Sequence, residues 1–297
     1  MTSATPNRLP VFFLSHGGPN QATEESSTAD FFEKLGQHWT DSLGNLPEDV
    51  RPKKILVISA HWEGENGVVR VRTKPENQLY YDFYGFPQFM YELKYPSVGD
   101  AALGQRVLDL LKENGVPAAA ETKRGVDHGV WVPFLRVLPK PHIPIVQMSL
   151  AKMPGKSTKE VLEYHYKLGQ VLSKLREENV LIVASGTAVH NLRDMRFYSG
   201  TNKVAPYVKP FDKLLDKAAL AESAQERVRF GVDEIAESKF LPLAHPELDH
   251  LLPFQVALGA AGDDKAQAIH KDFLWSLSSS AYAFGDSNDL SGLSLAV

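Results

Sequence analysis

The sequence predicts a single-domain α/β sandwich with a mainly parallel central sheet flanked by helices. Short β-branched runs recur along the chain, and most are followed by a stretch with helical periodicity, which is typical of parallel sheets. No internal repeat, low-complexity tract or linker divides the 297 residues. A chain of this length can bury a sizeable core, so we expect one catalytic domain over residues 1–297.

Five short apolar runs predict the strands of this sheet. They are Pro10–Ser15, Lys54–Ser59, Val68–Thr73, Ile145–Ser149 and Val180–Ser185. Four segments between or after them predict helices, at Ala29–Leu43, Asp100–Asn114, Thr158–Asn179 and Pro210–Ala221, and a further helix is expected to begin near Glu247. From Val161 to Asn179 apolar residues recur three or four apart, which gives one buried stripe. Gly115 is expected to end the helix before it, because glycine readily takes the positive φ of a C-terminal cap.

Composition narrows the classes of function. The chain has 32 Lys+Arg against 36 Asp+Glu, a net charge of −4, and no basic block. A nucleic-acid groove or an anionic-membrane surface is therefore not expected, since both need clustered Lys and Arg. No secretory signal is readable, and the apolar runs fall far short of the ~20 residues of a membrane helix. We expect a cytoplasmic protein whose ligands are small molecules.

The chain contains no cysteine. This excludes disulfides, thiolate zinc sites, iron–sulfur clusters and a cysteine nucleophile. Any metal ion must be held by His, Asp or Glu. A Ser hydrolase and a nucleotide-dependent enzyme lack support as well, because the sequence has no Gly-x-Ser-x-Gly elbow and no glycine-rich phosphate loop.

Histidines provide the strongest functional signal. Five of the ten stand at predicted segment junctions, namely His16, His61, His128, His190 and His250. His16, His61 and His190 follow three predicted strands at their carboxyl ends, where open α/β sheets bind ligands, so we expect them to converge. Convergent imidazoles without thiolates suit a divalent ion such as Fe(II) or Zn(II). Four others have no such companions and are interpreted as structural or solvated: His38, His142, His165 and His270.

The segment Asp127-His128-Gly129 has two interpretations that can hold together. A carboxylate beside a histidine can orient it for acid/base or substrate-binding work. Asp127 can also be the N-cap of a segment over Val130–Leu138.

The stretch between Thr73 and Ser97 is rich in aromatic residues. It is too broken by Gly and Pro for a helix and too aromatic for a solvated linker. Such a loop either covers a flat aromatic substrate or is pinned to the core by its rings. We expect Tyr80–Tyr95 to wall the metal pocket, with Tyr84 and Phe86 as substrate contacts.

Six motifs follow one another along nearly the whole chain. They are Ser-His-Gly-Gly-Pro at 15–19, Ser-Ala-His-Trp at 59–62, Asp-Phe-Tyr-Gly-Phe-Pro at 82–87, Asp-His-Gly-Val-Trp-Val-Pro at 127–133, Ser-Gly-Thr-Ala-Val-His-Asn-Leu at 185–192 and Asp-His-Leu-Leu-Pro-Phe at 249–254. In this order they resemble the DOPA 4,5-dioxygenase-type branch of the class III extradiol ring-cleavage dioxygenases, a LigB-like family. Each motif alone is a weak signal, whereas six in the family's order are a specific one.

The resemblance implies a mononuclear non-haem metal site in a single α/β domain. It places the metal ligands at His16, His61 and His250, with Fe(II) for activity and Zn(II) as another ion that such a site can hold. Many iron extradiol enzymes use a carboxylate as third ligand, so Glu247 is the alternative to His250.

The resemblance also implies the catalytic roles and the reaction. His190 is expected to act as acid/base, His128 to assist bound oxygen or the substrate oxyanion, and Trp62 to contact the substrate. The expected reaction is extradiol opening of a catechol, such as a DOPA-like compound, with O₂. Two alternatives stay open: a zinc-dependent hydrolase that uses the same histidines, and a metal-binding accessory protein without turnover. The segment Gly18-Pro19-Asn20 departs from the Ser-Pro-Met of close relatives and faces the expected substrate side.

Overall fold

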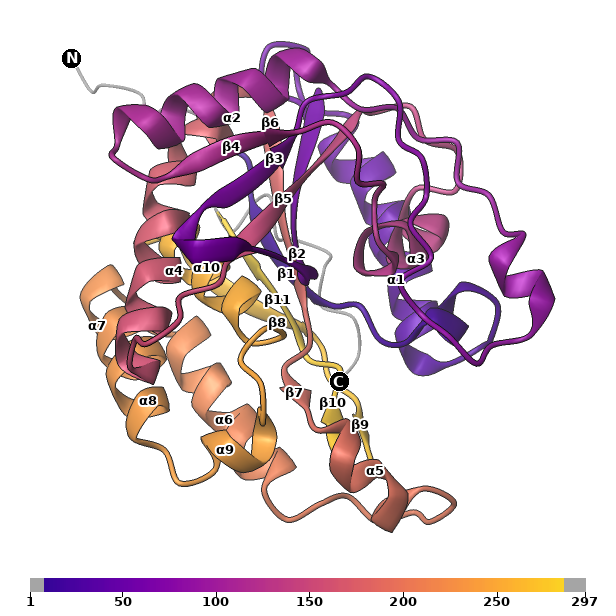
Figure 1. Cartoon of the computed structure of the whole chain (residues 1–297), viewed down its shortest axis with the longest axis vertical. Coiled ribbons are helices and arrows are strands. Elements are labelled where there is room, and N and C mark those ends of the chain that lie inside the picture. The colour runs from indigo at the N-terminus through magenta and orange to yellow at the C-terminus, as the bar shows by residue number, and fades with distance from the viewer. Residues whose placement is uncertain (1–7, 286–297) are drawn as a thin grey trace.

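Four parallel strands form the buried centre of the sheet (Figure 1). In the computed structural model, which describes residues 8–285, they lie in the order β5, β2, β6 and β1. Their bounds are Ile145–Ala151 for β5, Lys54–Gly64 for β2, Val180–Gly186 for β6 and Val11–Ser15 for β1. Each was predicted from a β-branched run, although β2 continues well beyond its predicted end at Ser59.

Strands of mixed direction extend this centre on both sides into an eight-stranded sheet. β3 (Val69–Arg72) pairs antiparallel with β5, and β4 (Ala118–Glu121) lies parallel to β3 at one edge. At the other side, β11 (Ala281–Phe284) is antiparallel to β1 and to β8 (Ala266–His270). A small second sheet joins β7 (Val189–His190), β10 (Leu277–Ser278) and β9 (Phe273–Leu274). The sequence predicted β3 alone among these additional strands.

Helices cover both faces of the large sheet and produce the predicted sandwich. Their bounds are Ser27–His38 for α1, Ala101–Glu113 for α2, His128–Val137 for α3, Thr158–Leu172 for α4, Leu192–Tyr198 for α5, Val208–Ala219 for α6, Ala224–Val228 for α7, Ile235–Glu237 for α8, Leu241–Ala244 for α9 and Leu252–Ala261 for α10. Within residues 8–285, no helix is both long enough and apolar enough to cross a membrane.

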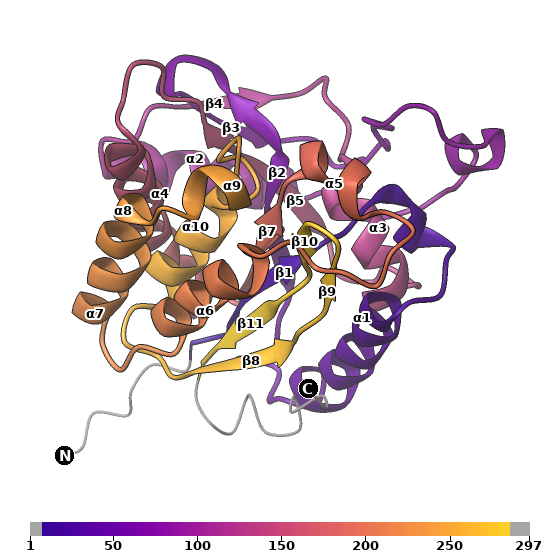
Figure 2. The ribbon, with the colours of Figure 1, turned by 90° about the horizontal axis from the view of Figure 1, so that it is seen from below.

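The core divides into two layers because successive side chains of a strand point to opposite faces. Phe13 and Ile58 face the layer that contains α2, α4, α6 and α10, whereas Phe12 and Val57 face α1 and α3. Figure 2 shows the two groups of helices on opposite sides of the sheet. The ends of the parallel strands between these layers carry the functional side chains described below.

Several predicted helix boundaries shift in the structure. α1 continues as a π-helical turn over Trp39–Leu43, and α4 continues as a 3₁₀ helix over Ser173–Glu178, so both predicted helices change geometry before they end. Gly115 has the predicted positive φ of +72° after α2. The helix expected near Glu247 begins only at Leu252, because the preceding residues form turns that bring His250 to the end of β6.

Candidate metal centre and active site

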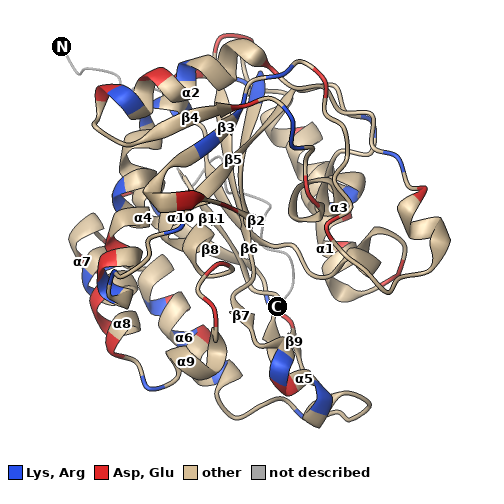
Figure 3. Cartoon of the chain, viewed as in Figure 1, with Lys and Arg blue, Asp and Glu red and all other residues tan. Residues whose placement is uncertain are grey.

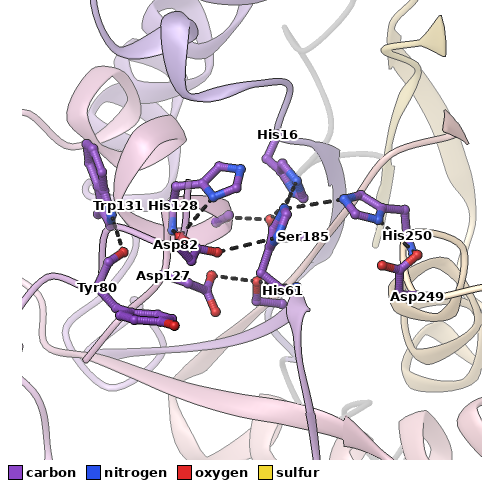
Figure 4. A network of polar contacts seen from close by, with 12 residues as sticks. His16, His61, Tyr80, Asp82, Asp127, His128, Trp131, Ser185, Asp249 and His250 are labelled. Carbon is purple, nitrogen blue, oxygen red and sulfur yellow. Dashed lines mark hydrogen bonds and ion pairs between the residues drawn. The ribbon is translucent and has the colours of Figure 1, made fainter. Parts of the chain in front are cut away.

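Three histidines from distant parts of the chain direct their Nε2 atoms toward one another (Figure 4). His16 follows β1, His61 lies within β2 and His250 stands just before α10. His61 Nε2 is 3.0 Å from His16 Nε2 and 3.3 Å from His250 Nε2. Imidazole nitrogens that share one ion at about 2.0–2.2 Å lie roughly 3 Å apart, so the three could hold a single metal ion.

The hydrogen bonds behind His16 fix its tautomer. Ser185 donates its hydroxyl hydrogen to the carbonyl of Gly129, so its oxygen can only accept from His16 Nδ1, 2.9 Å away. His16 therefore carries its proton on Nδ1, and its Nε2 presents a lone pair to the other two rings. A hydrogen-bonded outer nitrogen of this kind is typical of a metal-ligating histidine.

Carboxylates lie behind the other two rings. His61 Nδ1 is 3.4 Å from Asp82 Oδ2, and His250 Nδ1 is 3.0 Å from Asp249 Oδ1. Burial lowers the pKa of His61 to about 3; His128 and Arg124 reinforce this shift, and Asp82 and Asp249 oppose it. Burial and the other imidazoles also hold the pKa of His16 and that of His250 well below the ordinary value. Three unprotonated nitrogens that face one another fit the needs of a divalent cation.

A bulge in β2 carries His61 into this position. Ser59 pairs with Ser149 of β5, but the next paired residue is Glu63, opposite Leu150. The intervening residues are left out of the ladder, and such extra residues bend a strand and redirect its side chains. The sequence placed His61 after the strand, whereas the structure places it within β2, on this bulge.

Asp82 connects the aromatic segment to the site, although it was not among the predicted site residues. Its Oδ1 accepts hydrogen bonds from the backbone N and the ring Nδ1 of His128, both at 2.9 Å. His128 is the first residue of α3, and its ring centre is 3.9 Å from that of His61. The structure thus brings His128 to the cluster as expected. An acidic residue inside an aromatic run was the available signal for Asp82.

His190 lies on the opposite side of the cluster. Its ring stacks on that of His250, with centres 3.5 Å apart and planes inclined by 14°. Burial lowers the pKa of His190 to about 4, although the charge of Asp249 opposes that shift. His190 is therefore an unprotonated imidazole at neutral pH, in contact with the His250 ring of the cluster.

Asp127 occupies the N-cap position of α3, but its side chain does not cap the helix. The carboxylate instead accepts from Ser59 Oγ at 2.7 Å, from Gln147 Nε2 and from Arg124 Nη2 at 3.2 Å. The same Arg124 nitrogen donates to the carbonyl of His61 at 2.8 Å. The capping interpretation is therefore wrong for the side chain, because these buried donors compete for it, and Asp127 instead braces the bulge that carries His61.

Gly129 permits the close packing behind the site. A Cβ at this position would lie 2.7 Å from Ser59 Oγ and 3.1 Å from His61 Cδ2. Any larger residue would therefore displace the His61 ring or the hydroxyl beside it.

The aromatic segment reaches the cluster through Phe83 rather than through Tyr84. The Phe83 ring contacts His128 edge-on at 5.9 Å, and Phe86 packs against Phe83 at 5.2 Å. Tyr84 is 92% exposed and makes no ring contact with the histidines within residues 8–285. The rings of Tyr81 and Phe83 also pack against buried Trp131, so the segment is pinned to the core as well as facing the site.

Two further expectations concern residues near the cluster. Glu247, the alternative third ligand, is exposed and pairs with Arg193 at 3.0 Å, so the structure does not bring it to the histidines. Trp62 is buried and faces the guanidinium of Arg124. Its predicted contact with substrate stays a prediction.

The remaining histidines lie away from the three facing rings, mostly as expected. His165 is buried between the Val161 carbonyl and the Ala151 amide, and His270 stacks on Phe31. His142 is exposed. His245, which the sequence analysis did not assign, is buried and its Nε2 lies 2.9 Å from the Ala188 carbonyl in the loop that leads to His190.

Comparisons with known proteins agree with this geometry. Residues 10–285 match the family described as the catalytic LigB subunit of aromatic ring-opening dioxygenase. A 4,5-DOPA dioxygenase extradiol of Beta vulgaris is 37% identical over 266 residues, which cover 89% of this chain and 91% of the relative. One of Escherichia coli strain K12 is 32% identical over 255 residues, 85% of each chain.

The fold has a solved counterpart. The crystal structure of an uncharacterized protein from Escherichia coli K12 superposes with a TM-score of 0.72 at 28% identity, covering 94% of this chain and all of the other. The family match covers nearly the whole described chain, and the relatives are of similar length. Both findings support the same family as the clustered histidines do. The chain therefore belongs to the LigB family of aromatic ring-opening dioxygenases and is an extradiol ring-cleaving enzyme.

Proposed function

We propose that the enzyme opens the ring of a catechol with O₂ at an Fe(II) ion held by His16, His61 and His250. The arrangement of three facing Nε2 lone pairs, with His128 and His190 beside them, carries this proposal. A DOPA-like catechol amino acid is the first substrate to test, because the relatives in plants and bacteria carry that substrate in their names. When bound, the ferrous ion would supply a common site for both catechol oxygens and O₂, which makes their encounter effectively intramolecular.

The protein's own residues would then handle protons and orientation. His190, unprotonated at neutral pH, can accept the second hydroxyl proton of the catechol and later return it to the oxygen that is released by O–O cleavage. His128 is held by Asp82 at the other side of the cluster, where its ring can donate to the substrate oxyanion. Phe83 offers an aromatic edge for the catechol ring.

A zinc-dependent hydrolase has no observation in its favour. The histidine cluster is compatible with either metal, but the family and the similar proteins are all named as dioxygenases and none as a hydrolase. The cytoplasmic location and the identity of the metal remain predictions.

The decisive experiment is oxygen uptake by the reconstituted enzyme. The protein is loaded anaerobically with Fe(II) and mixed with DOPA, simple catechols, a hydroquinone and a larger polyphenol. We expect O₂ consumption equal to the catechol consumed, together with a yellow ring-opened product. Zinc-loaded protein and the variant His61→Ala serve as negative controls. Absence of uptake with every catechol would overturn the proposal.

A further inference from the structure

Arg72, the last residue of β3, is a buried cation that forms no ion pair with a carboxylate of residues 8–285. Its side chain is almost fully enclosed, at 4% exposure. Nη2 donates to the carbonyl of Glu76 at 2.7 Å, whereas Nε has no hydrogen-bond partner in residues 8–285. A buried charge is costly unless an opposite charge lies close to it. Among the described residues only the charge of Glu121 acts favourably on this guanidinium, and it does so without direct contact.

Glu121 is the nearest candidate to supply that charge, because it lies opposite Arg72 in the pairing of β3 with β4. Its Oε1, however, accepts hydrogen bonds from the backbone nitrogens of Lys123 at 2.6 Å and Arg124 at 3.1 Å. The carboxylate thus closes the turn after β4. Among the described residues it makes no ion pair with Arg72 within 4.0 Å.

A small cavity opens beside the Arg72 side chain. Its volume is about 50 Å³, and its lining consists of Arg72, Lys74, Glu76, Gln78, Thr122 and Lys123. Lys74 and Lys123 lie exposed at its rim, and in the described part of the chain neither ammonium group has a hydrogen bond or an ion pair. Lys and Arg residues gather along β3 and in the nearby turns in Figure 3. Three basic residues and one acidic residue, Glu76, thus line a space that is suited to a small ion and too small for an aromatic substrate.

We propose that this cavity binds a small inorganic oxyanion such as phosphate. The guanidinium and two ammonium groups would donate charge-assisted hydrogen bonds, and the Thr122 hydroxyl offers another donor. The site contains none of the clustered histidines, and the inference stands independently of the reaction proposed above. It is nevertheless connected to the active site, because Lys123 precedes Arg124, which donates to the carbonyl of His61.

Calorimetric titration of the full-length, metal-loaded protein with inorganic phosphate tests the site at constant ionic strength. We expect one saturable site per chain. Lys74→Ala and Lys123→Ala should each weaken it by about tenfold, the effect of one lost charge-assisted hydrogen bond. Lys112→Ala, which removes an exposed charge from α2, should bind phosphate like the wild type. Phosphate bound to the metal centre instead would be insensitive to all three substitutions and would overturn the proposal.

A phosphate monoester distinguishes a free ion from the head group of a larger metabolite. We expect glycerol phosphate to bind more weakly than inorganic phosphate, because the cavity leaves little room for the glycerol. Tighter binding of the ester would contradict the assignment of a free ion.

Thermal unfolding of Arg72→Gln gives a second readout. Phosphate should raise the Tm of the wild type, since a ligand that binds only the folded state stabilises it, and should leave the Tm of the variant unchanged. An equal rise in both proteins would rule the site out. If Arg72→Gln does not fold, the two lysine variants still decide.

Discussion

Asp82 Oδ1 lies 2.9 Å from both the backbone N and the ring Nδ1 of His128, so one carboxylate oxygen fixes the start of α3 and the orientation of its first side chain. The other oxygen faces His61 Nδ1. Burial alone would raise the pKa of Asp82, but its bonds to His128 and the nearby His61 give a net lowering, so it stays ionised at neutral pH. The aromatic segment is thus coupled to two site histidines at once.

Asp82→Asn should therefore impair the enzyme without unfolding it. Loss of an outer partner of a metal-ligating histidine typically costs 10–100-fold in metal affinity or activity, and we expect a loss of kcat in that range. Steady-state oxygen uptake and metal content measure the two effects. Asp109→Asn, on the exposed face of α2, is the matched control. Wild-type kcat and metal content in Asp82→Asn would show that the carboxylate does not orient these rings.

Removal of the metal should abolish activity reversibly. We expect a chelator to strip one ion per chain from the wild type, and Fe(II) to restore turnover. His61→Ala should bind far less metal and should not be restored, because it loses the nitrogen that faces both His16 and His250. Metal analysis and oxygen uptake are measured on the same samples. His142→Ala, at an exposed position, should retain both properties, and full metal occupancy in His61→Ala would remove it from the ligand set.

The aromatic segment should contribute to substrate binding through Phe83. Phe83→Ala loses an edge contact beside His128, and aromatic pairs contribute about 0.5–1.5 kcal/mol, so KM for a catechol should rise roughly two- to tenfold. Tyr84→Ala, at a fully solvated position, should change KM little. The comparison requires equal metal content in both variants. The opposite order of effects would mean that the segment rearranges when substrate binds.

The sequence predicted the centre of the fold better than its edges. The four parallel strands are buried on both faces and therefore read as β-branched runs. β4 consists of Ala118–Glu121 and carries no β-branched residue, so nothing in its composition indicates a strand. β11 is held by pairing with distant β1, and β8 by pairing with β11, which a local pattern cannot show.

The same distinction applies to the site. His16 and His61 could be predicted because the carboxyl ends of the parallel strands β1 and β2, which both pair with β6, lie at one edge of the sheet. Their partners Asp82 and Ser185 were not predicted, because Asp82 reaches His61 from the aromatic segment and Ser185 reaches His16 from strand β6, and neither pairing is visible in a local pattern. The bulge in β2 was not predicted either, and it places His61 within the strand instead of after it.

His190 should act on protons and not as an essential ligand. General acid/base catalysis contributes roughly 10²–10⁴-fold, so His190→Ala should lose about that much kcat while it retains its metal. Oxygen uptake and metal content are again measured together. Loss of the metal would show that His190 is a ligand. Undiminished turnover would show that His190 is not the acid/base and would assign proton transfer to His128.

Acid should destabilise the fold through buried histidines, and His165 isolates one contribution. Burial lowers its pKa from 6.5 to about 4, although its bond to the Val161 carbonyl opposes the shift. Between these two values the unfolded chain binds a proton that the folded chain does not. The free energy of unfolding therefore falls as the pH drops from about 6.5 to about 4, and the contribution is fully present above 6.5. A difference of about two and a half units between the pKa of His165 in the unfolded and folded states corresponds to a contribution of about 3 kcal/mol to the free energy of unfolding.

The variant His165→Gln cannot titrate in this range and should show a shallower loss of stability in acid. Urea unfolding of metal-free protein at several pH values between 7 and 4 measures the free energy of unfolding for wild type and variant. The other buried histidines titrate equally in both proteins, so the difference between the two slopes belongs to His165. His142→Gln, at an exposed position, should retain the wild-type slope. Parallel slopes for His165→Gln and wild type would mean that His165 becomes protonated within the folded protein, with its bonds to Val161 and Ala151 rearranged.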